Sequence, residues 1–253
     1  MMLFWSTTII LYGILIGSFL NVCIYRIPRN ESIAFPPSHC TTCGNPLKIK
    51  DLIPVFSYLS LKGKCRYCRE KISLQYPIVE LFNAMIHLIL FMKFGISLVF
   101  AKYALLSSLL IIVFFIDLTH QIIPDGIILL GLAASIVWLV FHIGDVSWIS
   151  GIIGFLLGGG LFLLIALVTH GAMGGGDIKL MGMLGLYLGW EHILLITFFS
   201  FIIGAIVSML LIFCKLKGRK DYIPFGPFIG IAALLSIFFG NAIIQWYIMR
   251  FFL

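Results

Sequence analysis

Two aspartates lie where long apolar stretches meet short polar loops. Asp117 ends an apolar run that starts at Ser108, and Asp177 directly follows three glycines. A carboxylate at the edge of a membrane-like segment is costly and is therefore a candidate for function. Two carboxylates a few ångströms apart share a proton, so one can act as general base on a water while the other donates to a carbonyl oxygen. This is the chemistry of an aspartic protease, and the sequence leaves open which aspartate takes which role.

Four cysteines form a second constellation. Cys40 and Cys43 make one C-x2-C pair, Cys65 and Cys68 make another, and 21 residues separate Cys43 from Cys65. Each pair supplies two corners of a tetrahedron, so the four thiolates predict a structural zinc site with no open coordination position. The alternatives are two disulfides or unused thiols, and a cytoplasmic location argues against disulfides.

The chain that must position these groups is very apolar. Of its 253 residues, 61% are hydrophobic and 11% are charged, whereas roughly a quarter of a soluble domain is charged. Apolar runs of about 20 residues are long enough to cross a bilayer as helices. We therefore predict an all-α polytopic membrane helix bundle with about eight spanning helices, at 3–25, 77–92, 98–116, 122–142, 149–168, 178–190, 193–214 and 227–249.

The distribution of Lys and Arg along the chain predicts its division into segments and its orientation in the membrane. We expect a first transmembrane helix over 1–25, a zinc-binding segment over 26–76 and a helix bundle over 77–253. Nine of the 17 Lys and Arg lie within 26–71 and four lie within 215–220, which marks cytoplasmic loops rather than a nucleic-acid surface. The basic side chains around the cysteines are expected to face anionic lipid heads of the bilayer.

This topology brings the loops that contain Asp117 and Asp177 to the same, cytoplasmic, face. Asp117 could instead be a helix-end charge, although acids are unfavourable at the negative end of a helix dipole. Asp177 could be a helix cap after a flexible loop. Neither interpretation explains why the two acids share a depth in the membrane.

Several stretches together resemble one family, the bacterial type IV prepilin peptidases, or leader peptidase/N-methyltransferases, of the GxGD class of membrane aspartyl proteases. The resemblance extends over almost the whole chain, and its motifs occur in order. They are GSFLNV (17–22), RIP (26–28), the paired C-x2-C motifs, SYLSLKGKCRYC (57–68), YPIVE (76–80), FIDLTHQIIPD (115–125), GGGDIKL (174–180) and IPFGP (223–227).

The resemblance implies that Asp117 and Asp177 are catalytic and that Gly174, Gly175 and Gly176 supply the G-x-G of the motif. It implies type IV prepilins or pilin-like proteins as substrates, cut at the cytoplasmic face of the bacterial inner membrane. It also implies methylation of the new N-terminal residue with S-adenosylmethionine. Gly63 and Glu80 are predicted to lie near that substrate or cofactor, on the resemblance alone.

Three other functions remain open from the sequence. The protein could be a peptidase without methyltransferase activity, with the cysteine segment serving for docking or stability. It could be a transporter that uses intramembrane carboxylates, although no internal repeat supports this. It could also be a zinc-bearing membrane scaffold, which leaves the paired acids without a purpose.

Overall fold

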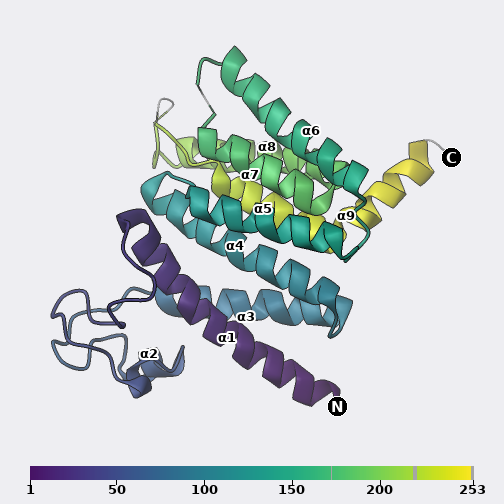
Figure 1. Cartoon of the computed structure of the whole chain (residues 1–253). Coiled ribbons are helices and arrows are strands. Elements are labelled where there is room, and N and C mark those ends of the chain that lie inside the picture. Colours follow the sequence, from purple (N-terminus) through teal and green to yellow (C-terminus); the bar gives the residue numbers. More distant parts are fainter. Residues whose placement is uncertain (172, 219–220, 252–253) are drawn as a thin grey trace. The chain divides into compact units, whose positions relative to one another are not determined.

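The computed structural model describes residues 1–171, 173–218 and 221–251, and within these ranges it contains helices and no β-strand (Figure 1). Ala172 of the glycine-rich loop and Arg219 and Lys220 of the second basic stretch lie outside the described residues. The elements are α1 (Met2–Arg26), η1 (Ile27–Arg29), η2 (Ile49–Asp51), α2 (Phe56–Ser60), α3 (Gln75–Phe94), α4 (Leu98–His120), α5 (Asp125–Val140), α6 (Trp148–Val168), α7 (Gly175–Leu188), α8 (Trp190–Phe213) and α9 (Gly226–Phe251).

The predicted all-helical membrane fold is confirmed, with a smaller number of full-length spans. Every predicted apolar segment coincides with a helix, but among the described residues six helices are long and apolar enough to cross a membrane. The exceptions are α5, with 16 residues, and α7, with 14. Helix α7 is short because Gly174 and Gly189 bound it, and most of its side chains are buried against protein rather than lipid.

The chain packs as two compact units, Met1–Ile112 and Val113–Leu253, and the boundary falls inside α4. In the first unit α1 packs along α3. A Cβ on Gly13 would lie 2.7 Å from the Ala84 Cα, and one on Gly17 would lie 2.6 Å from the Glu80 Cα. Only glycine permits such an approach, which is typical of helix contacts in membranes.

The second unit is built around α7, which packs against α5, α6 and α8 (Figure 1). The contact between α6 and α7 is the closest, because a Cβ on Gly185 would overlap the carbonyl group of Gly154. Helix α7, whose third residue is Asp177, is thereby packed tightly against its neighbours.

Candidate active site

Asp117 lies in the last turn of α4, with 3% of its surface exposed. Its Oδ2 accepts a hydrogen bond of 2.9 Å from the backbone N–H of Gly226, the first residue of α9. A Cβ on Gly226 would lie 2.6 Å from this oxygen. The N-terminus of α9 therefore fixes one carboxylate oxygen of Asp117, and its position requires a glycine.

Asp177 is the third residue of α7 and is 4% exposed. Its Oδ2 accepts a hydrogen bond of 3.2 Å from the backbone N–H of Gly174, so the residue does cap its own helix. Its Oδ1 is buried and accepts no hydrogen bond from the described residues. A capping role alone leaves this oxygen without a function, because buried carboxylate oxygens are normally paired.

Both aspartates line one cavity of about 290 Å³ in the second unit, and their carboxylates interact electrostatically. The other lining residues are Gln121, Ile122, Ile123, Asp125, Gly174, Gly175, Gly176, Lys179 and Tyr222. The structure thus brings Asp117, Asp177 and the three glycines together, as the sequence predicted. A cavity of this size admits several water molecules or a short stretch of peptide.

The three glycines contribute in different ways. Gly174 supplies the N–H that holds Asp177, whereas a Cβ on Gly175 would meet no atom within 4 Å. A Cβ on Gly176 would lie 2.9 Å from the Ile123 Cβ, so this glycine lets α7 start against the loop that follows α4. A Cβ on Gly174 would lie 3.0 Å from the Asp177 Oδ2, so side chains are crowded at the two outer glycines of the triplet and not at the middle one.

The four cysteines also come together, within the first unit. Their sulfur atoms all lie within 4.8 Å of one another, and Cys40 Sγ is 3.9 Å from Cys68 Sγ. Sulfur ligands around a tetrahedral zinc ion lie about 3.8 Å apart. The cluster therefore has the size of a metal site.

Each C-x2-C pair lies in a tight turn that directs N–H groups at sulfur. Hydrogen bonds from the backbone and side chain of Asn45 lower the pKa of the Cys43 thiol to about 7. Backbone N–H groups of Cys68 and Tyr67 likewise lower the pKa of Cys65. Such bonds favour the thiolate, which is the form that binds a metal, at Cys43 and Cys65. At Cys68 a backbone hydrogen bond from Glu70 acts in the same direction, but burial and the other thiols raise its pKa to about 12. The fit of the donor set to a cation therefore rests on the spacing of the four sulfur atoms.

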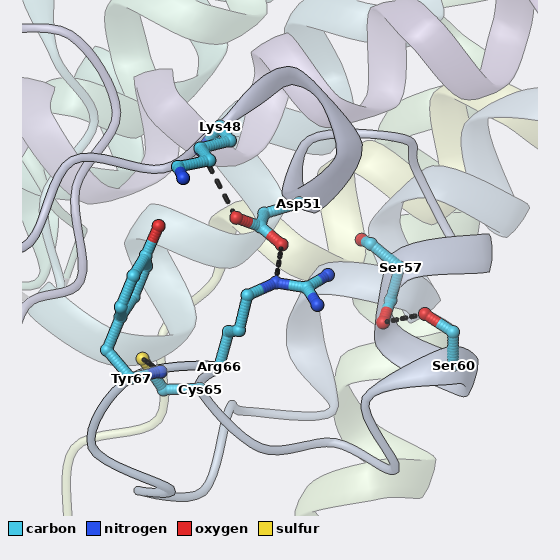
Figure 2. Close-up of polar contacts among 7 residues, drawn as sticks. All are labelled: Lys48, Asp51, Ser57, Ser60, Cys65, Arg66 and Tyr67. Atoms are coloured by element: carbon cyan, nitrogen blue, oxygen red, sulfur yellow. Dashed lines mark hydrogen bonds and ion pairs between the residues drawn. The ribbon is translucent and has the colours of Figure 1, made fainter.

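A partly buried ion pair supports the second of these turns. The Arg66 Nε lies 2.6 Å from the Asp51 Oδ1, and the Tyr67 backbone N–H donates to the Cys65 Sγ. Both contacts are drawn in Figure 2. The same aspartate accepts a hydrogen bond from the Lys48 backbone N–H at 3.2 Å. Asp51 thus links the loop at η2 to the turn around Cys65.

Glu80 and Gly63 lie in this unit, at positions with clear structural roles. Glu80 is buried in α3, and its Oε2 accepts a hydrogen bond of 2.7 Å from the backbone N–H of Val55, a residue with a φ of 61°. A positive φ is strained for a β-branched residue, so the carboxylate stabilises an unfavourable turn. Gly63 also has a positive φ, 67°, and its Cα faces the Tyr58 hydroxyl, which a Cβ would approach to 2.8 Å.

Comparison with known proteins gives this arrangement a context. The family model described as Bacterial Peptidase A24 N-terminal domain matches residues 11–94, and the one described as Type IV leader peptidase family matches residues 104–209. The chain belongs to the Type IV leader peptidase family. Its multi-pass architecture agrees with that of an inner-membrane member of the family.

Individual relatives match over nearly their whole length. A Bacillus subtilis (strain 168) protein named prepilin leader peptidase/N-methyltransferase is 35% identical over 238 residues, covering 94% of this chain and 96% of that protein. Proteins of the same name from Legionella pneumophila and Pseudomonas aeruginosa are 34% and 32% identical, each covering 94% of this chain and 92% of the relative. No solved structure matches the chain significantly.

Three features of this leader peptidase family member were not predicted as site residues from the sequence. Gly226 holds Asp117, and its signal was the glycine in the IPFGP stretch immediately before a predicted span. Asp125 and Lys179 form an exposed ion pair of 2.7 Å at the cavity.

Tyr222 is the third such feature, and it lies in the loop before α9. Partial burial raises the pKa of its hydroxyl, and the Asp177 and Asp117 carboxylates add to that effect. A tyrosine in this setting keeps its proton and can donate a hydrogen bond into the cavity.

Proposed function

We propose that this protein is a membrane-embedded aspartic endopeptidase that removes the leader of type IV prepilins or prepilin-like proteins. The observation that carries the proposal is the joint lining of one cavity by two buried aspartates, in a chain that belongs to the leader peptidase family. The excess of Lys and Arg in 26–71 supports, through the alternation of the spans, a cytoplasmic location for the loops that carry Asp117 and Asp177, where a leader would remain.

The two carboxylates have different roles in hydrolysis. One, ionised, removes a proton from a water that attacks the scissile carbonyl carbon, and the other, protonated, donates to the carbonyl oxygen. Breakdown of the tetrahedral intermediate returns a proton to the leaving nitrogen. Backbone N–H groups of Gly226 and Gly174 hold one oxygen of each aspartate, which leaves the second oxygen of each for the reaction.

We further propose that Cys40, Cys43, Cys65 and Cys68 hold a structural Zn²⁺. Four thiolates complete a tetrahedron, so the ion would order the segment 26–76 and would take no part in hydrolysis. The support for this assignment is the spacing of the four sulfur atoms, which all lie within 4.8 Å of one another.

The protein is also proposed to methylate the new N-terminal residue, since its relatives carry the name leader peptidase/N-methyltransferase. S-adenosylmethionine would supply the methyl group. Gly63 and Glu80 stay candidates for the neighbourhood of the substrate or of this cofactor. Both lie in the first unit, with the cysteine cluster.

One incubation tests both activities. The purified protein in lipid is mixed with a prepilin and with S-adenosylmethionine labelled in its methyl group. Loss of the leader together with label on the shortened pilin is the expected result. Leader loss without label would reduce the function to that of a peptidase, and an intact prepilin would contradict the proposal.

The glycine triplet provides a matched prediction. Gly176→Ala is expected to lower cleavage about 10²-fold, because its Cβ would push α7 away from Ile123 and shift Asp177 by a fraction of an ångström to one ångström. Gly175→Ala meets open space and is expected to retain activity within about threefold of wild type. Initial rates on one prepilin check both variants, and an equal effect of the two would contradict the assigned roles.

A second, independent prediction concerns Gly226, the residue that holds Asp117. In Gly226→Ala the new Cβ would displace the Asp117 carboxylate, so kcat is expected to fall about 10²-fold while the KM changes little. The matched control is Gly126→Ala at the exposed start of α5, outside the cavity lining, where a Cβ would meet no atom within 4 Å. If Gly226→Ala kept full kcat, the bond from Gly226 to Asp117 would have no part in catalysis.

A further inference from the structure

A second cavity in the same unit is an apolar groove of about 540 Å³. Helix α7 forms its floor, while α5 and α6 form its two sides, on either side of α7 in Figure 1. Large side chains at its edge are strongly exposed, including Leu129 at 64%, Leu156 at 63% and Leu163 at 48%. Apart from Asp125 and Lys179, the lining residues are apolar or glycine, which suits a chain segment that resides in the bilayer.

The glycines of α6 divide between two faces of the helix. Gly154 and Gly158 are pressed against the backbone of α7. In contrast, a Cβ on Gly160 would meet no atom within 4 Å, and the nearest atom to one on Gly159 is 3.7 Å away. Both of the latter glycines line the groove. Small residues let a second helix approach closely in a membrane, so the floor and side of the groove have the shape that a helix requires.

The groove is continuous with the candidate active site. Asp125 and Lys179 line both cavities, and their ion pair lies between them. A polypeptide that leaves the groove at this pair therefore arrives directly at Asp117 and Asp177. A lipid chain would gain nothing from that continuity, whereas a substrate must be held on one side of the bond to be cut.

We infer that the groove between α5 and α6 binds the apolar helix of the protein substrate, on the side of the scissile bond away from the leader. This inference rests on the proposed function and adds a docking site for the substrate. Gly160 and Leu163 become determinants of substrate affinity that lie outside the catalytic cavity.

The chain offers a matched pair for the test. Leu163 lines the groove, whereas its neighbour Leu164 is 59% exposed on α6 and is not part of the lining. A photoreactive benzophenone amino acid is placed at either position in the Asp177→Asn protein, which is incubated in lipid with a prepilin and illuminated. The expected result is a crosslink to the apolar helix of the substrate from position 163 and a much weaker one from 164.

Kinetics give a second readout in protein with both aspartates intact. Leu163→Trp and Gly160→Phe fill the groove and are expected to raise the KM for a membrane-embedded prepilin about tenfold, with kcat nearly unchanged. Leu164→Trp is expected to behave as the wild type.

Three outcomes would overturn the inference. They are crosslinks from position 163 to lipid or to a second copy of the protein only, equal crosslinking from 163 and 164, or an unchanged KM in both groove variants. Each is distinguishable from failure of the proposed function, because that failure appears in the wild-type protein as an uncut prepilin.

Discussion

Asp177→Asn is expected to lower prepilin cleavage by at least about 10³-fold without unfolding the protein. Asparagine cannot serve as general base and cannot give up a proton to the peptide. It retains an amide oxygen that can accept the hydrogen bond from the Gly174 N–H, so the start of α7 is preserved. Asp117→Asn is expected to behave in the same way, since its amide oxygen can still accept from Gly226.

The measurement compares initial rates of leader removal in lipid at equal amounts of folded protein. Helical content, zinc content and thermal unfolding of each variant show that the fold is unchanged. Asp145→Asn, an exposed acid in the loop between α5 and α6, is the control and should keep wild-type rates. If Asp177→Asn kept more than about a tenth of the wild-type rate, Asp177 would be a helix cap and no more.

Removal of zinc is the second change with a large expected effect. The segment between α1 and α3 contains, among its described residues, one short α-helix, two single-turn 3-10 helices and two isolated bridges, so few contacts hold it. A structural zinc site contributes roughly 10–16 kcal/mol of binding free energy at neutral pH, and in such small units most of it stabilises the fold. Cys65→Ser is therefore expected to abolish zinc binding and to expose the segment to proteolysis.

Limited proteolysis and metal analysis check this prediction. Cys214→Ser provides the control, because Cys214 is an exposed free cysteine outside the cluster. The control should keep one zinc per chain and a protected segment. A Cys65→Ser protein that retained both properties would show that the four cysteines serve another purpose.

The sequence predicted the helices well because apolar length is a strong signal in a membrane protein. The predicted run 149–168 coincides with α6 to within one residue. The short run 178–190 was likewise predicted as separate from 193–214, in agreement with α7 and α8. The exact position of the break could not be predicted, because it lies at Gly189, a glycine with a φ of 89°. A backbone angle of this kind depends on the packing of Gly189 against Ser150, which lies far away in the sequence.

The candidate site likewise contains residues that could be predicted from the sequence and residues that could not. Asp117, Asp177 and the cysteines could be predicted because carboxylates at apolar edges and paired C-x2-C motifs are rare. The role of Gly226 could not, because it depends on a contact between residues 109 positions apart. Glu80 was named on the resemblance alone, and its bond to Val55 could not be predicted because it depends on how the cysteine segment folds.

The central claim is that Asp117 and Asp177 act as a single catalytic pair. It is tested most directly by measuring leader removal for Asp117→Asn, Asp177→Asn and the double variant side by side. Residues that act as one unit are strongly non-additive, so the account predicts that the double variant is about as slow as either single variant. A double variant slower by the product of the two single effects would show that the aspartates act independently, and would contradict the account.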